Sequence, residues 1–235
     1  MQCSILGIKS GFCGRLGNDD FGHEYERNFL SKEIDITNVK RSDISTGVAC
    51  ISVDDIGRNT IVIIPSANNL ISPQDIQQAS LELSNSKLLL VQNEIPREST
   101  LEALKLAKSY NAITIFNPAP AATLTELNEL ITYSDVICPN ELELSTLTNL
   151  PTETEAQIEY AAKNLLTHTT PGTVVVVTLG ERGAMIVRSS GAILIPVPDA
   201  YKTQAVDTVG AGDCFIGTPL IHSFDCIYTI IFIVP

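Results

Sequence analysis

Seven residues combine a glycine-rich turn with two carboxylates: Asp207-Thr208-Val209-Gly210-Ala211-Gly212-Asp213. A short apolar run precedes them, and Cys214-Phe215-Ile216 follows in helical register. Glycines at a strand-to-helix turn let backbone N–H groups approach an anion, and the helix N-terminus adds partial positive charge. In the first helical turn, Asp213 is placed to take a proton from a hydroxyl that attacks a phosphate. An ordinary glycine-rich helix start with Asp213 as a cap residue is the alternative.

Several better-known motifs are absent from the sequence. No G-x-x-x-x-G-K-[ST] run occurs, and Phe215 stands where G-x-G-x-x-G would need its third glycine. The six cysteines form no C-x-x-C pair, and the three histidines form no H-x-x-x-H or H-E-x-x-H pattern. We therefore expect reduced thiols and no zinc site.

The length and composition are typical of one large globular domain, or of one domain with a small appendage. Of 235 residues, 44% are hydrophobic and 18% are charged, which excludes a disordered chain. The net charge of -12 argues against binding to nucleic acid or to an anionic membrane. No targeting segment is recognised at either end, and the apolar tail over 226–234 is too short to span a bilayer. We expect a cytoplasmic protein without a nucleic-acid or membrane partner.

Apolar segments and amphipathic segments alternate from residue 72 onward. The pattern predicts strands over 87–91, 112–116, 135–138 and 173–178, and helices over 72–83, 98–109, 123–132, 141–147 and 155–166. Such alternation is typical of an α/β fold with a parallel sheet flanked by helices. A separate hairpin, with strands over 46–53 and 60–64, follows a helix over about 21–32.

Polar residues follow the predicted strands, where ligands bind in parallel sheets. They are Gln92-Asn93-Glu94, Asn117-Pro118, Asn140-Glu141, Thr178-Leu179-Gly180 and Asp207. Each motif also has a plain structural interpretation. Glu94 could be a solvated loop carboxylate, and Asn140 with Glu143 could form only a helix cap. The run from Thr178 to Gly183 could be a simple hairpin turn.

Taken together and in this order, the motifs resemble those of the PfkB carbohydrate kinases, the ribokinase family. The resemblance rests on G-x-D-x-F-G at Gly17–Gly22, Q-x-E ending at Glu94, N-P-A-P-A from Asn117, N-x-x-E at Asn140–Glu143, T-L-G-x-x-G at Thr178–Gly183 and the glycine turn before Asp213. It spans about 16–217. It implies an ATP-dependent sugar kinase that converts D-ribose to D-ribose 5-phosphate.

The resemblance also implies roles for individual residues. Asp213 would be the catalytic base, and Gly210, Ala211 and Gly212 the anion hole. Glu94 and Asp213 would bind the sugar. ATP would contact Asn140, Thr178, Leu179, Gly180, Glu181, Arg182, Gly183, Gly212 and Asp213. Glu143 would hold Mg²⁺ through water, whereas Asp207 and the Val209 carbonyl would bind K⁺.

In this family the hairpin position, about 45–64, belongs to a β-lid that covers the sugar and often mediates dimerisation. We therefore expect a single ribokinase-like domain over 1–235, a lid and a homodimer through that lid. Both ends depart from the family pattern, which starts with an Asn-x-Asp strand and a Gly-Gly-Lys-Gly-type loop. We expect an incomplete domain, and Pro219 should disturb the helix after Asp213. A catalytically silent, binding-only chain and a kinase for another sugar or nucleoside are the alternatives.

Overall fold

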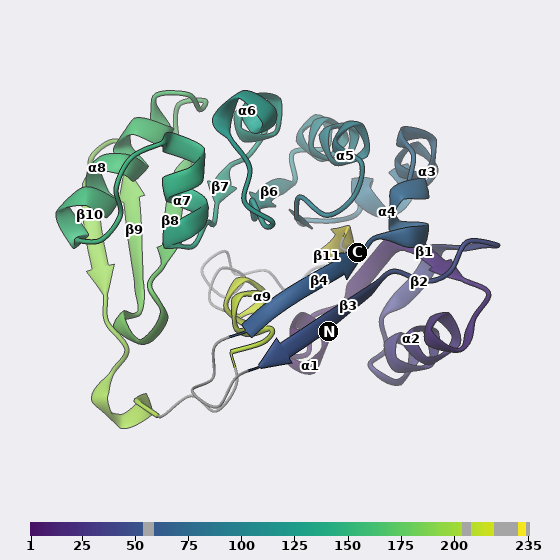
Figure 1. The fold of residues 1–235 in the computed structure, drawn as a ribbon. Helices are drawn as coiled ribbons and strands as arrows, with labels where there is room; N and C mark the ends of the chain where they lie inside the picture. The colour runs from purple at the N-terminus through teal and green to yellow at the C-terminus, as the bar shows by residue number, and fades with distance from the viewer. Residues whose placement is uncertain (54–58, 204–207, 219–229, 234–235) are drawn as a thin grey trace.

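The computed structural model describes residues 1–53, 59–203, 208–218 and 230–233 (Figure 1). The strands are β1 (Ser10–Gly17), β2 (Asp35–Ser42), β3 (Val48–Val53), β4 (Asn59–Ile64), β5 (Leu88–Val91), β6 (Ile113–Phe116), β7 (Val136–Ile137), β8 (Val174–Thr178), β9 (Ala184–Arg188), β10 (Gly191–Ile195) and β11 (Ile230–Ile233). The α-helices are α1 (Gln2–Ile5), α2 (Asp20–Ser31), α3 (Pro73–Gln78), α4 (Ser80–Ser84), α5 (Arg97–Ser109), α6 (Leu124–Thr132), α7 (Glu141–Thr148), α8 (Glu155–Leu166) and α9 (Ala211–Gly217). Among these helices none is both long and apolar enough to cross a membrane.

One large sheet runs through the described part of the chain in the order β10-β9-β8-β7-β6-β5-β11-β1-β2. Strands from β8 through β2 pair in parallel, whereas β9 pairs antiparallel with both β8 and β10 at one edge. β11 pairs in parallel with both β1 and β5, so it joins the β1–β2 pair to the rest of the sheet. The predicted, mostly parallel α/β sheet is confirmed.

Helices cover both faces of this sheet (Figure 1). Leu89 and Val91 of β5 pack into one buried cluster, which takes in residues of α3, α5, α6, α7 and α8. Leu88 and Leu90 point the other way, into a second cluster that contains residues of α1, α2 and α9. Because successive strand residues face opposite sides, a strand buried on both faces must be apolar throughout. This requirement explains the uninterrupted apolar run of β5.

Most predicted elements after residue 72 are found within one or two residues of their expected ends. The helix predicted over 72–83 is instead split at Ala79 into α3 and α4. Ser72 caps α3 as expected, with Pro73 in the first turn. The turn predicted after β3 and the apolar run before Asp207 lie outside the described residues.

Four strands of the large sheet were not predicted from the sequence: β1, β2, β10 and β11. β1 contains three glycines in Ser10–Gly17, and β2 carries mainly polar residues. Neither segment shows the apolar run or clean alternation that predicts a strand. Their strand conformation therefore depends on pairing with neighbours. α9 ends at Gly217, and Pro219, which we expect to disturb this helix, lies outside the described residues.

The predicted hairpin is present as a two-stranded antiparallel sheet, β3–β4, separate from the large sheet. Its base is fixed to the turn after β1. The Thr46 hydroxyl donates to Asp19 at 2.6 Å and accepts the Gly17 N–H at 2.9 Å. Asp19 also caps α2 by accepting the Gly22 N–H at 2.8 Å. One carboxylate thus anchors both the helix start and the hairpin base.

A buried carboxylate ties α3 to the two strands next to it. Asp75 accepts hydrogen bonds from Arg15 of β1 at 2.9 Å and from Lys40 of β2 at 2.5 Å. It also completes the capping box of α3 by accepting the Ser72 N–H at 2.9 Å. Burial alone would raise the pKa of Asp75, but these donors outweigh it and lower the pKa to about 2. The carboxylate therefore stays ionised and paired at neutral pH.

Candidate active site

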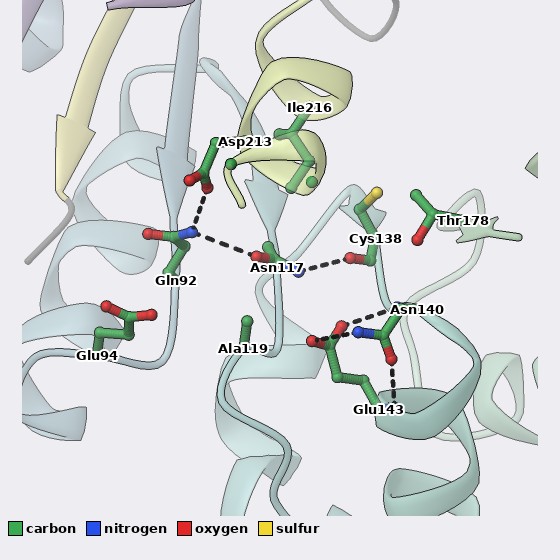
Figure 2. A pocket seen from close by; sticks show the side chains of 12 residues that line it. Gln92, Glu94, Asn117, Ala119, Cys138, Asn140, Glu143, Thr178, Asp213 and Ile216 are labelled. Carbon is green, nitrogen blue, oxygen red and sulfur yellow. Dashed lines mark hydrogen bonds between the residues drawn. The ribbon is translucent and has the colours of Figure 1, made fainter. Parts of the chain in front are cut away.

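A polar cavity lies at the carboxyl ends of the parallel strands, below α9 (Figure 2). Each of the four strands β5 to β8 contributes a side chain from the residues at or just beyond its end: Gln92, Asn117, Asn140 and Thr178. Glu94, Ala119, Cys138, Glu143 and four residues of the α9 segment complete the lining. As expected, polar residues that follow different strands lie together in this cavity. Asp207, the last of the predicted set, lies outside the described residues.

Asp213 enters the cavity from the first turn of α9 (Figure 2). Gly210 precedes the helix with φ +72°, in the left-handed region that glycine adopts without strain. The side chain of Asp213 does not cap the helix; one of its oxygens, Oδ1, instead accepts a hydrogen bond from Gln92 Nε2 at 3.0 Å. The carboxylate therefore faces the strand ends, where a ligand of the cavity would lie.

Glu94 lines the same cavity and is half-buried rather than fully solvated. Burial raises the pKa of Glu94 to about 7, and the nearby negative charge of Asp213 adds to the rise. Two carboxyl groups with different surroundings can take different protonation states near neutral pH. A protonated Glu94 can both donate and accept hydrogen bonds, which suits a ligand rich in hydroxyl groups.

Asn140 and Glu143 form a complete capping box at the start of α7. The Asn140 side chain accepts the Glu143 N–H at 2.8 Å, and Glu143 accepts the Asn140 N–H at 2.8 Å. The two residues thus form the helix cap that was the alternative to a ligand site, yet both also line the cavity. Burial raises the pKa of Glu143, although the Asn140 N–H opposes this shift. Capping and facing a ligand are therefore compatible at this helix start.

The segment from Thr178 to Gly183 connects β8 to the antiparallel strand β9. Thr178 lines the cavity, and its N–H donates to the Pro139 carbonyl at 3.0 Å. Gly183 has φ +98°, and a Cβ there would lie 2.0 Å from the Ile195 carbonyl oxygen, so only glycine fits. The side chain of Arg182 pairs with Glu141 at the start of α7. The turn is thereby fixed beside the Asn140 helix start.

Not every predicted site residue lines the cavity. Of the predicted nucleotide-contacting set, Leu179, Gly180, Glu181, Arg182 and Gly183 lie beyond its wall, as does Ala211 of the glycine turn. Leu179 is buried, whereas the side chain of Val209 is 44% exposed. Gly210 and Gly212 do line the cavity, next to Asp213.

The sequence places Gln92 and Asn117 at strand ends, and its run from Asn117 to Ala121 is interpreted as a structural device at the site edge. It predicts no ligand contact for Gln92, Asn117, Cys138 or Ile216. Gln92 and Asn117 are buried polar residues that follow β5 and β6 directly. Their position at a strand end indicated that they could face a ligand. The contacts of Gln92 with Asn117 and Asp213 could not be predicted from the sequence. Cys138 contributes its carbonyl to this contact, and burial raises the pKa of its thiol well above the usual range.

The sequence pattern of the pfkB family carbohydrate kinases matches residues 3–220. The chain belongs to this family. A mouse (Mus musculus) ribokinase is 36% identical over 222 residues, which cover 92% of this chain and 66% of the mouse protein. A deoxyribokinase of Salmonella typhi is 36% identical over 207 residues, covering 86% of this chain and 65% of that protein.

A solved structure, that of Arabidopsis thaliana ribokinase complexed with ribose and ATP, matches this pfkB-family chain with a TM-score of 0.80 and 27% identity. The match covers 96% of this chain and 75% of the plant protein. The ribokinase-like fold expected from the motifs is confirmed. The chain spans about two thirds of the length of the mouse and Salmonella relatives.

The raised pKa of Glu94 predicts a pH-dependent stability effect. Because its folded-state pKa of about 7 lies above the ordinary value of 4.5, ionising Glu94 destabilises the fold as pH rises through this window. We expect Glu94→Gln to be more stable than the parent at pH 8, by on the order of 1 kcal/mol after allowance for partial exposure. The difference should shrink towards pH 5.

Urea denaturation of both proteins at pH 5 and pH 8 measures this difference. Glu24→Gln, at an exposed position on α2, controls for the loss of one negative charge. A stability difference between Glu94→Gln and the parent that stays constant with pH would contradict the raised pKa.

Proposed function

We propose that this chain supplies the active site of an ATP-dependent sugar kinase that transfers the γ-phosphoryl group of ATP to the terminal hydroxyl of D-ribose. The observation that supports it most is the position of Asp213. This carboxylate projects from the first turn of α9 into a polar cavity and faces Glu94 and the strand ends. Membership of the carbohydrate kinase family and similarity to ribokinases agree with this activity.

Asp213 would act as the general base of this reaction. Its Oδ1 is held by Gln92, so the other oxygen, Oδ2, would accept the proton of the attacking sugar hydroxyl. The hydroxyl oxygen then attacks the phosphorus, the bond to the ADP oxygen breaks, and ADP leaves with the electron pair. Glu94 would hold a second hydroxyl of the sugar and thereby fix its orientation in the cavity.

The backbone around Gly210 and Gly212 would stabilise the charge on the transferred phosphoryl group. The first N–H groups of a helix have no partner within the helix and carry partial positive charge. Gly212 and Asp213 belong to this first turn, and both line the cavity. The Ala211 N–H, by contrast, already donates to the Thr208 carbonyl at 3.2 Å. We therefore assign the anion-hole donors mainly to the next two residues.

ATP would lie over the segment from Thr178 to Gly183 and against Asn140. A parallel bridge pairs Asn140 with Thr178, so these two predicted nucleotide contacts lie side by side. Because the turn after Thr178 lies beyond the cavity wall, it would contact the nucleoside part, whereas Thr178 and Asn140 would face the phosphates.

The donor set of the cavity fits Mg²⁺ held through water and phosphate. Among the described residues no group of three or more His, Cys, Asp or Glu side chains forms a direct metal cage. Glu143 is buried, and its carboxylate already accepts from Asn140, so it would hold the ion through water. Mg²⁺ bound in this way would neutralise charge on the phosphates.

Replacement of the base should separate chemistry from binding. We expect Asp213→Asn to lower kcat by about 10²- to 10⁴-fold and to leave Mg-ATP affinity within a few-fold, because the amide cannot accept the proton. Single-turnover kinetics with ribose and calorimetric titration with an ATP analogue measure the two effects. Asp199→Asn, at an exposed position remote from the cavity, is the matched control.

D-Ribose and 2-deoxy-D-ribose should be compared in the same assay, because the Salmonella deoxyribokinase is as similar as the mouse ribokinase. Ribose should give the higher kcat/KM. Near-parental turnover in Asp213→Asn would remove Asp213 from the proposed role. Binding of ATP without turnover of any sugar by the parent chain would favour a binding-only protein.

We propose that K⁺ supports this activity through Asp207 and the Val209 carbonyl. Asp207 lies outside the described residues, and the proposal is supported by the position of both residues directly before the glycine turn. A cation held there would order the backbone around Gly210. Turnover should be several-fold higher in K⁺ than in Na⁺ at matched ionic strength, and equal rates in the two salts would refute the site.

We propose further that the chain forms a homodimer through the β3–β4 lid. Four consecutive residues of β4, from Ile61 to Ile64, are each 45–60% exposed and apolar, which is costly in a lone hairpin. Val62→Lys should shift the protein from dimer to monomer in analytical ultracentrifugation. Leu81→Lys replaces another exposed apolar residue, on α4, and should leave the mass unchanged. A monomeric parent would contradict the proposal.

A further inference from the structure

A chain of amide hydrogen bonds crosses three neighbouring strand ends and stops at the candidate base (Figure 2). Gln92, which follows β5, is only 6% exposed. Its Nε2 lies 3.0 Å from Asp213 Oδ1 and 3.4 Å from Asn117 Oδ1. Asn117, which follows β6, donates from Nδ2 to the Cys138 carbonyl at 2.8 Å. Both amide hydrogens of Gln92 are thus directed at acceptors.

The donor and the acceptor of each hydrogen bond in this series follow from the backbone carbonyl of Cys138, at the end opposite Asp213. A backbone carbonyl can only accept, so the amide group that faces Cys138 must be the NH₂ of Asn117. The Asn117 carbonyl oxygen then has to face Gln92 and can only accept as well. Gln92 must therefore present its NH₂ group, and this same group faces Asp213.

We propose that Gln92 is a positioning residue for the base: it holds Oδ1 of Asp213 and thereby leaves Oδ2 directed at the substrate hydroxyl. This inference rests on the proposed function. A carboxylate on a short helix can rotate about its side-chain torsions, so one bound oxygen selects the orientation of the other. A glutamine suits this purpose because it donates a hydrogen bond without adding charge.

The charges around the cavity also favour a neutral donor such as the Gln92 amide beside Asp213. Among the described residues that line the cavity, the titratable groups are Asp213, Glu94, Glu143 and the Cys138 thiol, and none of these four is a cation. The two carboxyl groups of Asp213 and Glu94 repel each other when both are ionised. A lysine at this position would add a positive charge beside the carboxylate of Asp213. The Gln92 amide instead holds the carboxylate with a hydrogen bond from a neutral group.

Removal of the donor should reduce turnover more than binding. We expect Gln92→Met, of similar length but without hydrogen-bonding groups, to lower kcat by about 10- to 100-fold, the effect of one hydrogen bond to a charged group. The KM for Mg-ATP should stay within about two-fold. Gln77→Met, on the exposed surface of α3, is the matched control, and thermal unfolding reports whether each variant is folded.

A second variant distinguishes positioning from a general loss of packing. In Gln92→Glu the introduced carboxyl can donate to Asp213 only when it is protonated, and it repels Asp213 when it is ionised. Activity relative to the parent should therefore recover as pH falls from 8 to 6. A purely structural defect would give no such recovery. Turnover of Gln92→Met within two-fold of the parent, or a Gln92→Glu profile parallel to that of the parent, would overturn the proposal.

A measurement without turnover separates this inference from the proposed function. The Gln92 amide proton that faces Asp213 should be protected from exchange in the parent protein, and Asp213→Ala should shift its NMR signal and remove its protection. If the parent turns over no sugar, the proposed function fails. In that case retained protection in Asp213→Ala would also refute the contact, whereas lost protection would support the positioning geometry.

Discussion

Burial of the central strands on both faces is the constraint on which the rest of this structure depends. β5 and β6 lie between two helical layers, so their side chains are apolar in both directions except for Thr114, whose buried hydroxyl faces two acceptors, the Tyr133 carbonyl and the Asp135 carboxylate. The other polar groups follow where these strands leave the sheet. Parallel pairing brings their carboxyl ends to one edge, and the polar residues therefore meet there. The cavity is a consequence of this arrangement.

Buried polar groups at that edge require partners, and the structure supplies them across strands. The amide of Asn117 lies between Gln92 and the Cys138 carbonyl, so three strand ends share one hydrogen-bonded chain. Each missing partner would leave a desolvated group, which typically costs about 1–3 kcal/mol. The same bonds that satisfy the strand ends also orient Asp213. Stability and the orientation of the candidate base are thus linked at Gln92.

Two further carboxylates join elements that lie outside the cavity wall. Asp75 joins α3 to β1 and β2, while Asp19 joins the start of α2 to the base of the β3–β4 hairpin. Both carboxylates act as helix caps and as links between elements remote in sequence. Asn140 and Glu143 similarly cap α7 and line the cavity. In this protein a helix cap is often also the contact that positions a neighbouring segment.

The α/β class, the hairpin and the polar strand ends could be predicted from the sequence, because apolar periodicity and turn residues are local properties. The sequence singled out Asp213, Glu94 and Asn140 as candidate site residues because each follows a strand or glycine turn and matches a motif of the carbohydrate kinase family. The position of β11 between β1 and β5 could not be predicted, since the pairing of distant strands leaves no local pattern in the sequence. The contact between Gln92 and Asp213, 121 residues apart, likewise required the folded sheet to bring α9 over the end of β5.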